Sequence, residues 1–328
     1  FTEDGEVWNL NFTCTKQITV NVKDNVPGEN IQGATITYFT QTKTTDASGN
    51  AVFYWSGTNR NISVSAPNLE SYTGQIYRNS TNPFNVVLTR AVNPVTLVVR
   101  EVIPAHTTYY QNLQIKYTAG SATGTLTTDA NGAVTFNGYI GTEMSFTVVG
   151  HPEFYSNPTQ KHTYTAANQS WTMDLTVTAK ITINVKSNVP SGTNLSGATV
   201  TYFNQTGTTN SSGNVSLYRS SVTNTVTATA TYHGNYSGNI TSSSASPFNV
   251  VMTRSTATVN LTVNETYSGG STFTYPSMKM IFSPAASTSP LTLDTAGSVS
   301  FVCYLGTPVT FTPQTRANYY SNPNNQLT

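Results

Sequence analysis

The chain has 328 residues, of which 37% are hydrophobic, so it can form sizeable cores in about two to four domains. Only 9% of the residues are charged and the formal net charge is +1. This balance excludes the dense cationic surface on which nucleic-acid binding depends. No apolar run is long enough to cross a bilayer as a helix, so we expect no membrane span.

The first predicted element is a strand within "EVWNLNFTC", residues 6–14. Four apolar side chains, Trp8, Leu10, Phe12 and Cys14, alternate there with polar ones. A period of two is typical of a half-buried strand, which needs a neighbouring strand and a core. The next predicted strand follows without a turn, so the partner of this segment is not its neighbour in the chain.

Internal repeats organise the rest of the chain. The turn "TTDASGN" at 44–50 returns as "TTDANGA" at 127–133, "TTNSSGN" at 208–214 and "TLDTAGS" at 292–298. Short alternating runs rich in Val, Ile, Thr, Tyr and Phe separate these turns and favour strands. We predict an all-β fold of four tandem Ig-like or transthyretin-like β-sandwiches of about 80 residues each. They occupy residues 16–91, 92–178, 179–255 and 256–328, after an N-terminal segment at 1–15.

The repeated turn has two interpretations. An acidic residue ahead of a glycine occurs in calcium loops, but one acid per turn is too few for a cation that takes six or more oxygen ligands. Asn210 also replaces the acid in the third repeat. Asp and Asn share the ability to fold a side-chain oxygen onto their own backbone, and glycine supplies positive φ. We therefore expect hairpin turns and no metal.

The motifs "GATITYF" at 33–39 and "TTDASGNAVF" at 44–53 resemble carboxypeptidase regulatory-like and Cna-B-like domains, which are transthyretin-related sandwiches of surface proteins. Cna-B-like domains often carry an isopeptide bond between a Lys of the first strand and an Asn of the last. The resemblance places it at Lys23 with Asn85 and at Lys186 with Asn249. Residues 179–255 contain no Asp or Glu, and Lys23 alternates away from its apolar neighbours. We expect Lys23 to face solvent and to form no such bond.

The sequence of the opening strand is similar to that of the last strand of the second sandwich. "VWNLNFTCTKQITVNVK" at 7–23 matches "SWTMDLTVTAKITINVK" at 170–186, with Trp8 aligned to Trp171. The fourth sandwich ends in "SNPNNQLT", which aligns with "SNPTQKHT" at 156–163, and we expect it to lack a last strand. The sequence therefore predicts donor-strand complementation, in which residues 1–15 of one copy complete the fourth sandwich of the next. This resembles chaperone–usher pili and archaeal thread-like filaments.

The two cysteines lie far apart in sequence. Cys14 falls on the apolar face of the predicted donor strand, and Cys303 alternates with Val299 and Phe301 toward the core of the fourth sandwich. Two free core thiols are one interpretation. The alternative, which the donor-strand hypothesis favours, is an intersubunit Cys14–Cys303 disulfide in an oxidising, extracellular compartment.

Asn-x-Ser/Thr triplets suggest N-glycosylation, which would hydrate a surface poor in charge. Six of them crowd into the third sandwich. The candidates are Asn11, Asn61, Asn79, Asn168, Asn194, Asn204, Asn210, Asn214, Asn235, Asn239, Asn260 and Asn264.

No catalytic set is apparent. His106, His151, His162 and His233 are scattered without metal-ligand spacing or a Ser, His and acid context, so we expect neither an enzyme nor a cofactor. The sequence favours a structural subunit of an extracellular, cell-surface, pilus-like filament whose partners are copies of itself. One period of a long covalent tandem-repeat protein and a carbohydrate-binding adhesin stalk are the alternatives.

Overall fold

The computed structural model describes residues 4–104, 106–284, 286–287, 289–314, 320 and 324–327. Over these residues the chain is built of strands, with one 3₁₀ turn, η1 (Pro152–Phe154), as the helical element. The predicted all-β fold of tandem sandwiches is confirmed. The chain forms two compact units, Phe1–Val177 and Thr178–Thr328, and each unit contains two sandwiches.

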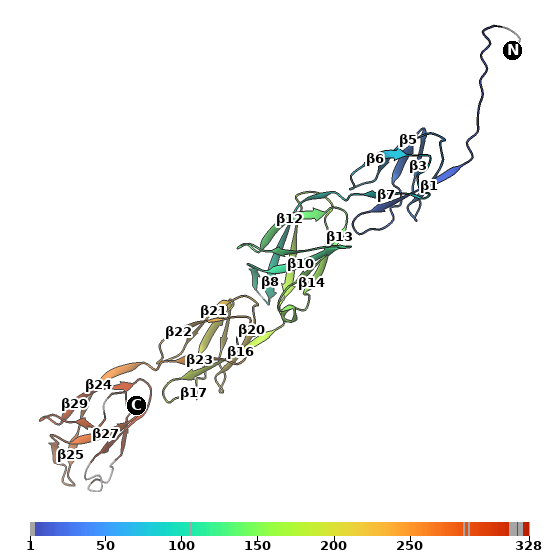
Figure 1. Ribbon diagram of the computed structural model, residues 1–328. Helices are drawn as coiled ribbons and strands as arrows, with labels where there is room; N and C mark the ends of the chain where they lie inside the picture. Colours follow the sequence, from blue (N-terminus) through green and yellow to red (C-terminus); the bar gives the residue numbers. More distant parts are fainter. Residues whose placement is uncertain are drawn as a thin grey trace. The chain divides into compact units, whose positions relative to one another are not determined.

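Sandwich 1 packs a three-stranded sheet, in the order β4-β1-β7, against a four-stranded sheet, β3-β2-β5-β6 (Figure 1). Its strands are β1 (Gln17–Asp24), β2 (Thr35–Tyr38), β3 (Gln41–Thr44), β4 (Asn50–Tyr54), β5 (Arg60–Ser65), β6 (Tyr72–Ile76) and β7 (Phe84–Leu88).

Sandwich 2 repeats this plan with sheets β12-β8-β15, to which β9 adds by pairing with β8, and β11-β10-β13-β14. Its strands are β8 (Val92–Ile103), β9 (His106–Tyr109), β10 (Gln114–Ala119), β11 (Ala122–Thr127), β12 (Ala133–Tyr139), β13 (Glu143–Val148), β14 (Thr159–Thr163) and β15 (Ser170–Thr176).

Sandwich 3 has β16 paired with β17, β20 and β23 in one sheet, and β19-β18-β21-β22 in the other. Its strands are β16 (Lys180–Ser187), β17 (Thr193–Asn194), β18 (Thr199–Tyr202), β19 (Gln205–Thr208), β20 (Asn214–Tyr218), β21 (Asn224–Thr229), β22 (Tyr236–Ile240) and β23 (Phe248–Met252).

Sandwich 4 has one four-stranded sheet, β28-β27-β30-β31, and two short pairs, β24-β29 and β25-β26. Its strands are β24 (Thr256–Thr262), β25 (Asn264–Thr266), β26 (Thr272–Thr274), β27 (Lys279–Ser283), β28 (Leu291–Thr292), β29 (Ser298–Tyr304), β30 (Val309–Pro313) and β31 (Asn325–Leu327).

Strand alternation builds each core. In β1 the side chains of Ile18, Val20 and Val22 are fully buried. Lys23, the next residue, points to the opposite face and is exposed to solvent, as the alternation predicts. Asn85 is also exposed, and it stands opposite Asn21 rather than Lys23 in the β1–β7 register. The positions implied for an isopeptide bond are thus on the solvent face.

The repeated turn has the same geometry in all four sandwiches. In sandwich 1, Asp46 Oδ1 accepts hydrogen bonds from the backbone N–H groups of Ser48 at 2.8 Å and Asn50 at 2.9 Å. Gly49 follows with φ of +73°, a conformation that glycine adopts without strain. Asp129, Asn210 and Asp294 each accept the same two bonds in their turns. The carboxylates therefore close the turns, and no cluster of metal-binding side chains occurs among the described residues.

Sandwiches 1, 2 and 3 pair their first and last strands in the same way. The last strand of each pairs in parallel with the first: β7 with β1, β15 with β8, and β23 with β16. Within the described part of sandwich 4, β24 pairs with β29 and has no such parallel partner.

Candidate functional site: an exposed apolar segment and an open sheet edge

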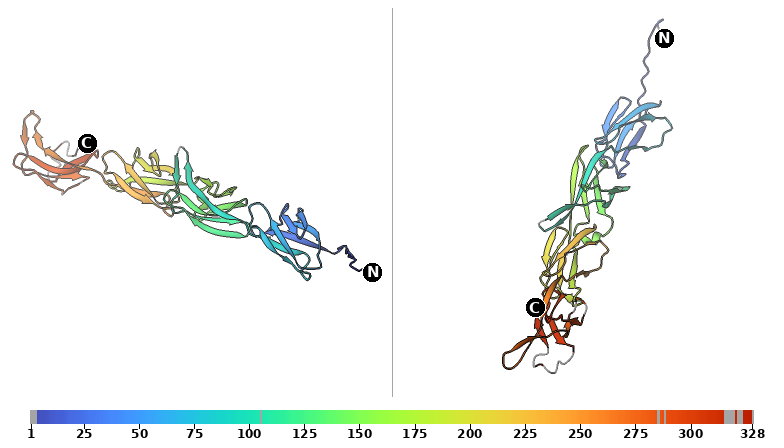
Figure 2. Two further views of the ribbon diagram at one scale, coloured as in Figure 1. Left: turned by 90° about the horizontal axis from the view of Figure 1, so that it is seen from above. Right: turned by 90° about the vertical axis from the view of Figure 1, so that its left-hand side faces the viewer.

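The segment ahead of β1 is exposed although it carries large apolar side chains. Trp8 is 73% exposed, Leu10 80% and Phe12 88%, and the described residues 4–16 contain no strand. In Figures 1 and 2 the segment leads away from β1 as a single extended run of chain. The predicted strand therefore does not form within this chain. Exposed apolar side chains at alternate positions are typical of a segment that is buried in a partner.

β15, the matching segment of sandwich 2, shows what this pattern does when it is paired. It lies parallel to β8, with Trp171 opposite Leu97 and Met173 opposite Val99. Met173 is fully buried, as is Leu175 two positions further along. This strand closes the core of sandwich 2.

Trp171 of β15 fills a defined position. Its ring stacks on His162 with centroids 4.8 Å apart and packs against Phe146 at 5.7 Å. His162 belongs to β14 and Phe146 to β13, so the tryptophan joins the two sheets of the sandwich. Burial lowers the pKa of His162 below its ordinary value, because removal from water disfavours the charged imidazolium.

β24, the first strand of sandwich 4, has an edge that no strand of the described residues covers, whereas β15 covers the equivalent edge of β8 in sandwich 2. Val95 in β8 is 1% exposed, whereas Val259, its counterpart in β24, is 40% exposed. Leu261 and Val263, the counterparts of Leu97 and Val99, are half-buried instead of fully buried. The difference is the area that β15 removes from water in sandwich 2.

An apolar cavity of about 210 Å³ lies beside this edge. Leu261, Phe311 and Leu327 line it, and their counterparts in sandwich 2 are Leu97, Phe146 and His162. These are the three side chains around Trp171. Phe301, Cys303 and Gly306 also line it, and their counterparts Phe136, Gly138 and Gly141 lie beside Tyr164 in sandwich 2. The cavity therefore covers the places that the rings of Tyr164 and Trp171 take in sandwich 2. The sequence analysis did not identify these lining residues. Aligning the strands of sandwich 4 with those of sandwich 2 would have identified them.

A tyrosine–glutamate pair recurs at the far end of both edges; it is buried in sandwich 2 and half-buried in sandwich 4. The Tyr155 hydroxyl donates to Glu101 Oε1 at 2.6 Å, and the Tyr320 hydroxyl donates to Glu265 Oε1 at 2.7 Å. Burial, together with the hydrogen bond to Glu265, raises the pKa of Tyr320 above its ordinary value. In sandwich 2 this carboxylate lies opposite Leu175 of β15. The edges of sandwiches 2 and 4 thus share this pair as well as the aligned valines and leucine.

Cys303 lies beside the open edge, whereas Cys14 lies in the exposed segment ahead of β1. Cys303 lines the cavity and pairs with Ala257 at the start of β24. The counterpart of Cys14 is Val177, whose N–H donates to Val102 O near the end of β8. Carried over to sandwich 4, that position is Thr266. Ala257 and Thr266 are separated by about 30 Å of strand.

Within the single chain both cysteines are free, and the intersubunit disulfide stays a prediction. A disulfide requires Cα atoms about 4.4 to 6.8 Å apart, which a donor strand in the register of β15 would not allow for Cys14 and Cys303. In the structure Cys14 is exposed, and its thiol donates to the carbonyl oxygen of Trp55 at 2.7 Å.

The histidines form no common site. His233 is buried, with Nδ1 2.8 Å from Thr231 O and Nε2 3.0 Å from the Ser187 hydroxyl, so it has a structural role in sandwich 3. His151 lies 3.0 Å from Glu153 on the surface. His106 bonds the Thr108 hydroxyl, and His162 stacks on Trp171.

The candidate glycosylation sites lie at the surface. All twelve asparagines are exposed except Asn214, which is half-buried and accepts a hydrogen bond from Asn184 Nδ2 at 2.7 Å.

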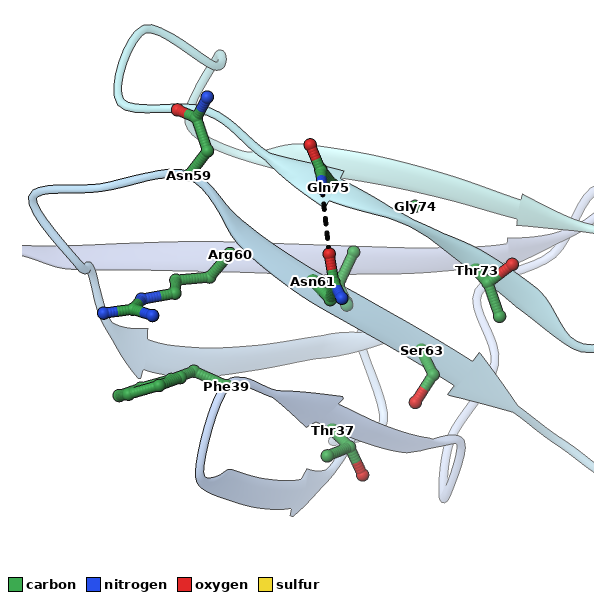
Figure 3. A pocket seen from close by; sticks show the side chains of 10 residues that line it. Thr37, Phe39, Asn59, Arg60, Asn61, Ser63, Thr73, Gly74 and Gln75 are labelled. Carbon is green, nitrogen blue, oxygen red and sulfur yellow. Dashed lines mark hydrogen bonds between the residues drawn. The ribbon is translucent and has the colours of Figure 1, made fainter.

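One of these asparagines lies in a shallow hollow of about 660 Å³ on the sheet of β5 and β6 (Figure 3). There Gln75 Nε2 donates to Asn61 Oδ1 at 3.0 Å, as the dashed line in Figure 3 marks. Thr225 and Asn239 form the equivalent cross-strand pair of sandwich 3. Sandwiches 1 and 3 thus each have one glycosylation triplet at this pair, Asn61 on β5 and Asn239 on β22.

Comparisons with known proteins return β-sandwich proteins. No family model matches the chain, and no curated protein matches it. Among solved structures, the chain is similar to the Bacillus anthracis TIE protein at 13% identity and a TM-score of 0.31. That match covers 73% of this chain, which spans about half (49%) of the TIE chain.

Two pilins are also similar. The shaft pilin SpaA of Lactobacillus rhamnosus GG matches at 10% identity and a TM-score of 0.22, covering 50% of this chain and 98% of the pilin. The minor pilin GBS52 of Streptococcus agalactiae matches at 11% identity and a TM-score of 0.25, covering 50% and 97%. At this level the comparisons carry no argument about function. Among the described residues no helix is long and apolar enough to cross a membrane.

Proposed function

We propose that this protein is a structural subunit of an extracellular, pilus-like filament that assembles head to tail by donor-strand complementation. Residues 7–14 of one copy add as a parallel strand to β24 and β25 in sandwich 4 of the next copy. One observation carries the proposal. The same apolar pattern is buried as β15 in sandwich 2, is exposed at residues 7–14, and has a matching uncovered edge in sandwich 4.

The register of β15 on β8 supplies the contacts of the joint. Trp8 stands opposite Leu261 and enters the cavity of about 210 Å³ between Phe311 and Leu327. Leu10 stands opposite Val263, and Phe12 stands opposite Glu265. Burying Trp8, Leu10 and Phe12 contributes roughly 2 to 3 kcal/mol each. Main-chain hydrogen bonds add about 1 kcal/mol apiece, and ordering the segment offsets part of this gain.

Assembly through this contact can continue from copy to copy. The donor and the acceptor are different surfaces, so the contact is heterologous and each added copy presents a new edge. The register leaves the two cysteines unbridged, and the filament is held by the buried strand. Exposed asparagines on all four sandwiches support N-glycosylation of its surface away from the joint, where Asn11 and Asn264 face each other unmodified.

Deleting residues 4–13 tests the proposal, because these residues form no strand of the free chain. We expect the variant to keep its far-ultraviolet circular dichroism and to remain a monomer in size-exclusion chromatography and electron microscopy. A synthetic peptide of residues 4–16 should bind it and should cap assembly of the intact chain. Polymers formed by the deletion variant would refute donor-strand assembly.

Denaturing native filaments distinguishes head-to-tail assembly of separate chains from a covalent array of repeats. Head-to-tail assembly predicts release of single chains of about the 35.3 kDa of this sequence, apart from any glycans. Release of a much longer chain would mean that the joint repeats within one polypeptide. Binding of free glycans by the monomer would instead favour a carbohydrate-binding stalk.

A further inference from the structure

The chain holds two donor segments and two acceptor edges of one design. β15 occupies the edge of β8, and residues 7–14 are assigned to the edge of β24 and β25. The inward-facing side chains are similar in both, with Trp171 matched by Trp8 and Met173 matched by Leu10. Apolar burial alone would therefore let either donor occupy either edge. The covalent connection of β15 favours its own edge, and a feature that distinguishes the two donors adds to that selection.

The outward-facing pair in sandwich 2 is charged. Asp174 of β15 stands opposite Arg100 of β8 in the parallel register. Arg100 Nε donates to Asp174 Oδ1 at 2.8 Å, and Nη2 donates to Oδ2 at 2.9 Å. Both side chains are partly exposed, at 34% for the arginine and 47% for the aspartate. The two parallel bonds favour one geometry and one partner.

The equivalent pair at the proposed joint is neutral. The same register places Asn11 of the donor opposite Asn264 of β25. Two amides satisfy each other by hydrogen bonding without any charge. Inserting residues 7–14 into sandwich 2 would place Asn11 opposite Arg100. Inserting β15 into sandwich 4 would place Asp174 opposite Asn264. Each exchange removes the two charge-assisted bonds.

We propose that this outward-facing pair determines which donor strand each edge accepts: Asp174 with Arg100 inside sandwich 2, and Asn11 with Asn264 between copies. The inference rests on the proposed donor-strand assembly, and it names the specificity residues of that joint. The partner it selects is a second copy of this chain. An amide at position 11 keeps the donor of one copy from displacing the closing strand of another.

A double-mutant cycle tests the pairing. The acceptor is the unglycosylated chain lacking residues 4–13, with or without Asn264→Arg. The ligand is a fluorescently labelled peptide of residues 4–16, with or without Asn11→Asp, and its dissociation constant is measured by anisotropy. Recreating the ion pair should make the doubly substituted combination bind about two- to fivefold tighter than additive single effects predict. This coupling should shrink toward one at high salt, because partly exposed charges are screened.

Asn9→Asp in the peptide is the matched control. Asn9 faces the same way but stands opposite Thr262, so it should show no coupling to Asn264→Arg. Peptide binding with a coupling of one, or with equal coupling for Asn9→Asp and Asn11→Asp, would overturn the role of this pair and leave the donor strand intact. Absence of binding by any of the peptides would overturn the joint itself.

Discussion

Sandwiches 2 and 4 are built from the same sequence pattern, yet one is closed and the other is open. In sandwich 2, β15 covers the edge of β8, fills the space beside Phe146 with Trp171 and buries Val95. In sandwich 4 the same edge exposes Val259 and leaves a cavity. The comparison teaches that one sequence pattern forms a paired strand in sandwich 2, whereas its repeat at residues 7–14 is exposed.

The largest expected effect separates an internal strand from a donor strand. Leu175→Asp places a charge in the closed core of sandwich 2 and should cost more than about 4 kcal/mol of its free energy of unfolding. Phe12→Asp changes an exposed side chain, so the free chain should unfold within about 0.5 kcal/mol of the original. It should nevertheless abolish assembly. Urea unfolding with hydrogen exchange, and electron microscopy, measure the two outcomes.

Equal sensitivity of the free chain to both substitutions would remove the distinction. It would mean that residues 7–14 already stabilise a sandwich of their own chain.

The next effect concerns the turn glycines. At Gly132, with φ of +68°, an added Cβ would lie 2.5 Å from Val99 O. At Gly297, with φ of +73°, the nearest atom would be Tyr275 N at 3.0 Å. Gly132→Ala should therefore cost about 2 to 3 kcal/mol and Gly297→Ala about 1 to 2 kcal/mol. Thermal unfolding followed by domain-resolved proteolysis measures this order, and a reversed order would contradict the tighter packing of sandwich 2.

A smaller effect comes from the tyrosine–glutamate pairs. Tyr155→Phe removes a hydrogen bond from Glu101, which is 1% exposed, and should cost about 1 to 3 kcal/mol. Tyr320→Phe should cost less than about 1 kcal/mol in the free chain, because Glu265 is only half-buried.

Binding of the peptide of residues 4–16 covers Glu265, so Tyr320→Phe should then also weaken peptide affinity. Isothermal titration measures that loss. An unchanged affinity would place Phe12 away from Glu265 and would require another register.

The smallest expected effect is at the cysteines. Cys14→Ser and Cys303→Ser, alone or together, should leave the length and the denaturant resistance of filaments unchanged, because the register keeps the thiols about 30 Å apart. Non-reducing electrophoresis after thiol blocking should show single chains. A disulfide-linked dimer that disappears in either variant would show that the donor strand adopts a different register.

Much of the fold follows from local chemistry that the sequence displays. The Asp or Asn and the following Gly of each turn predict hairpins, since both act within a few residues of chain. The alternation of Ile18, Val20 and Val22 predicts which face of β1 is buried. The match between Trp8 and Trp171 shows that residues 7–14 repeat the sequence pattern of the closing strand β15.

These local patterns do not predict the register between strands that are distant in sequence. A period of two says nothing of position along a strand. The structure pairs Cys303 with Ala257, and the contact of Val177 with Val102 gives the end of the edge at which a donor strand in the register of β15 would place Cys14. The lining of the cavity by Phe311 and Leu327 likewise depends on strands distant in sequence.

The sequence by itself determined the repeats, the turns, the apolar faces and the repeat of the β15 pattern at residues 7–14, because each is encoded in side chains close together in the chain. The tertiary structure alone decided which residues face one another across the sheets: Arg100 with Asp174, Cys303 with Ala257, and Leu261 beside the cavity. Those contacts depend on parallel and antiparallel registers between distant strands. Hydrogen bonding and core packing set these registers together, and neither is visible in a single strand.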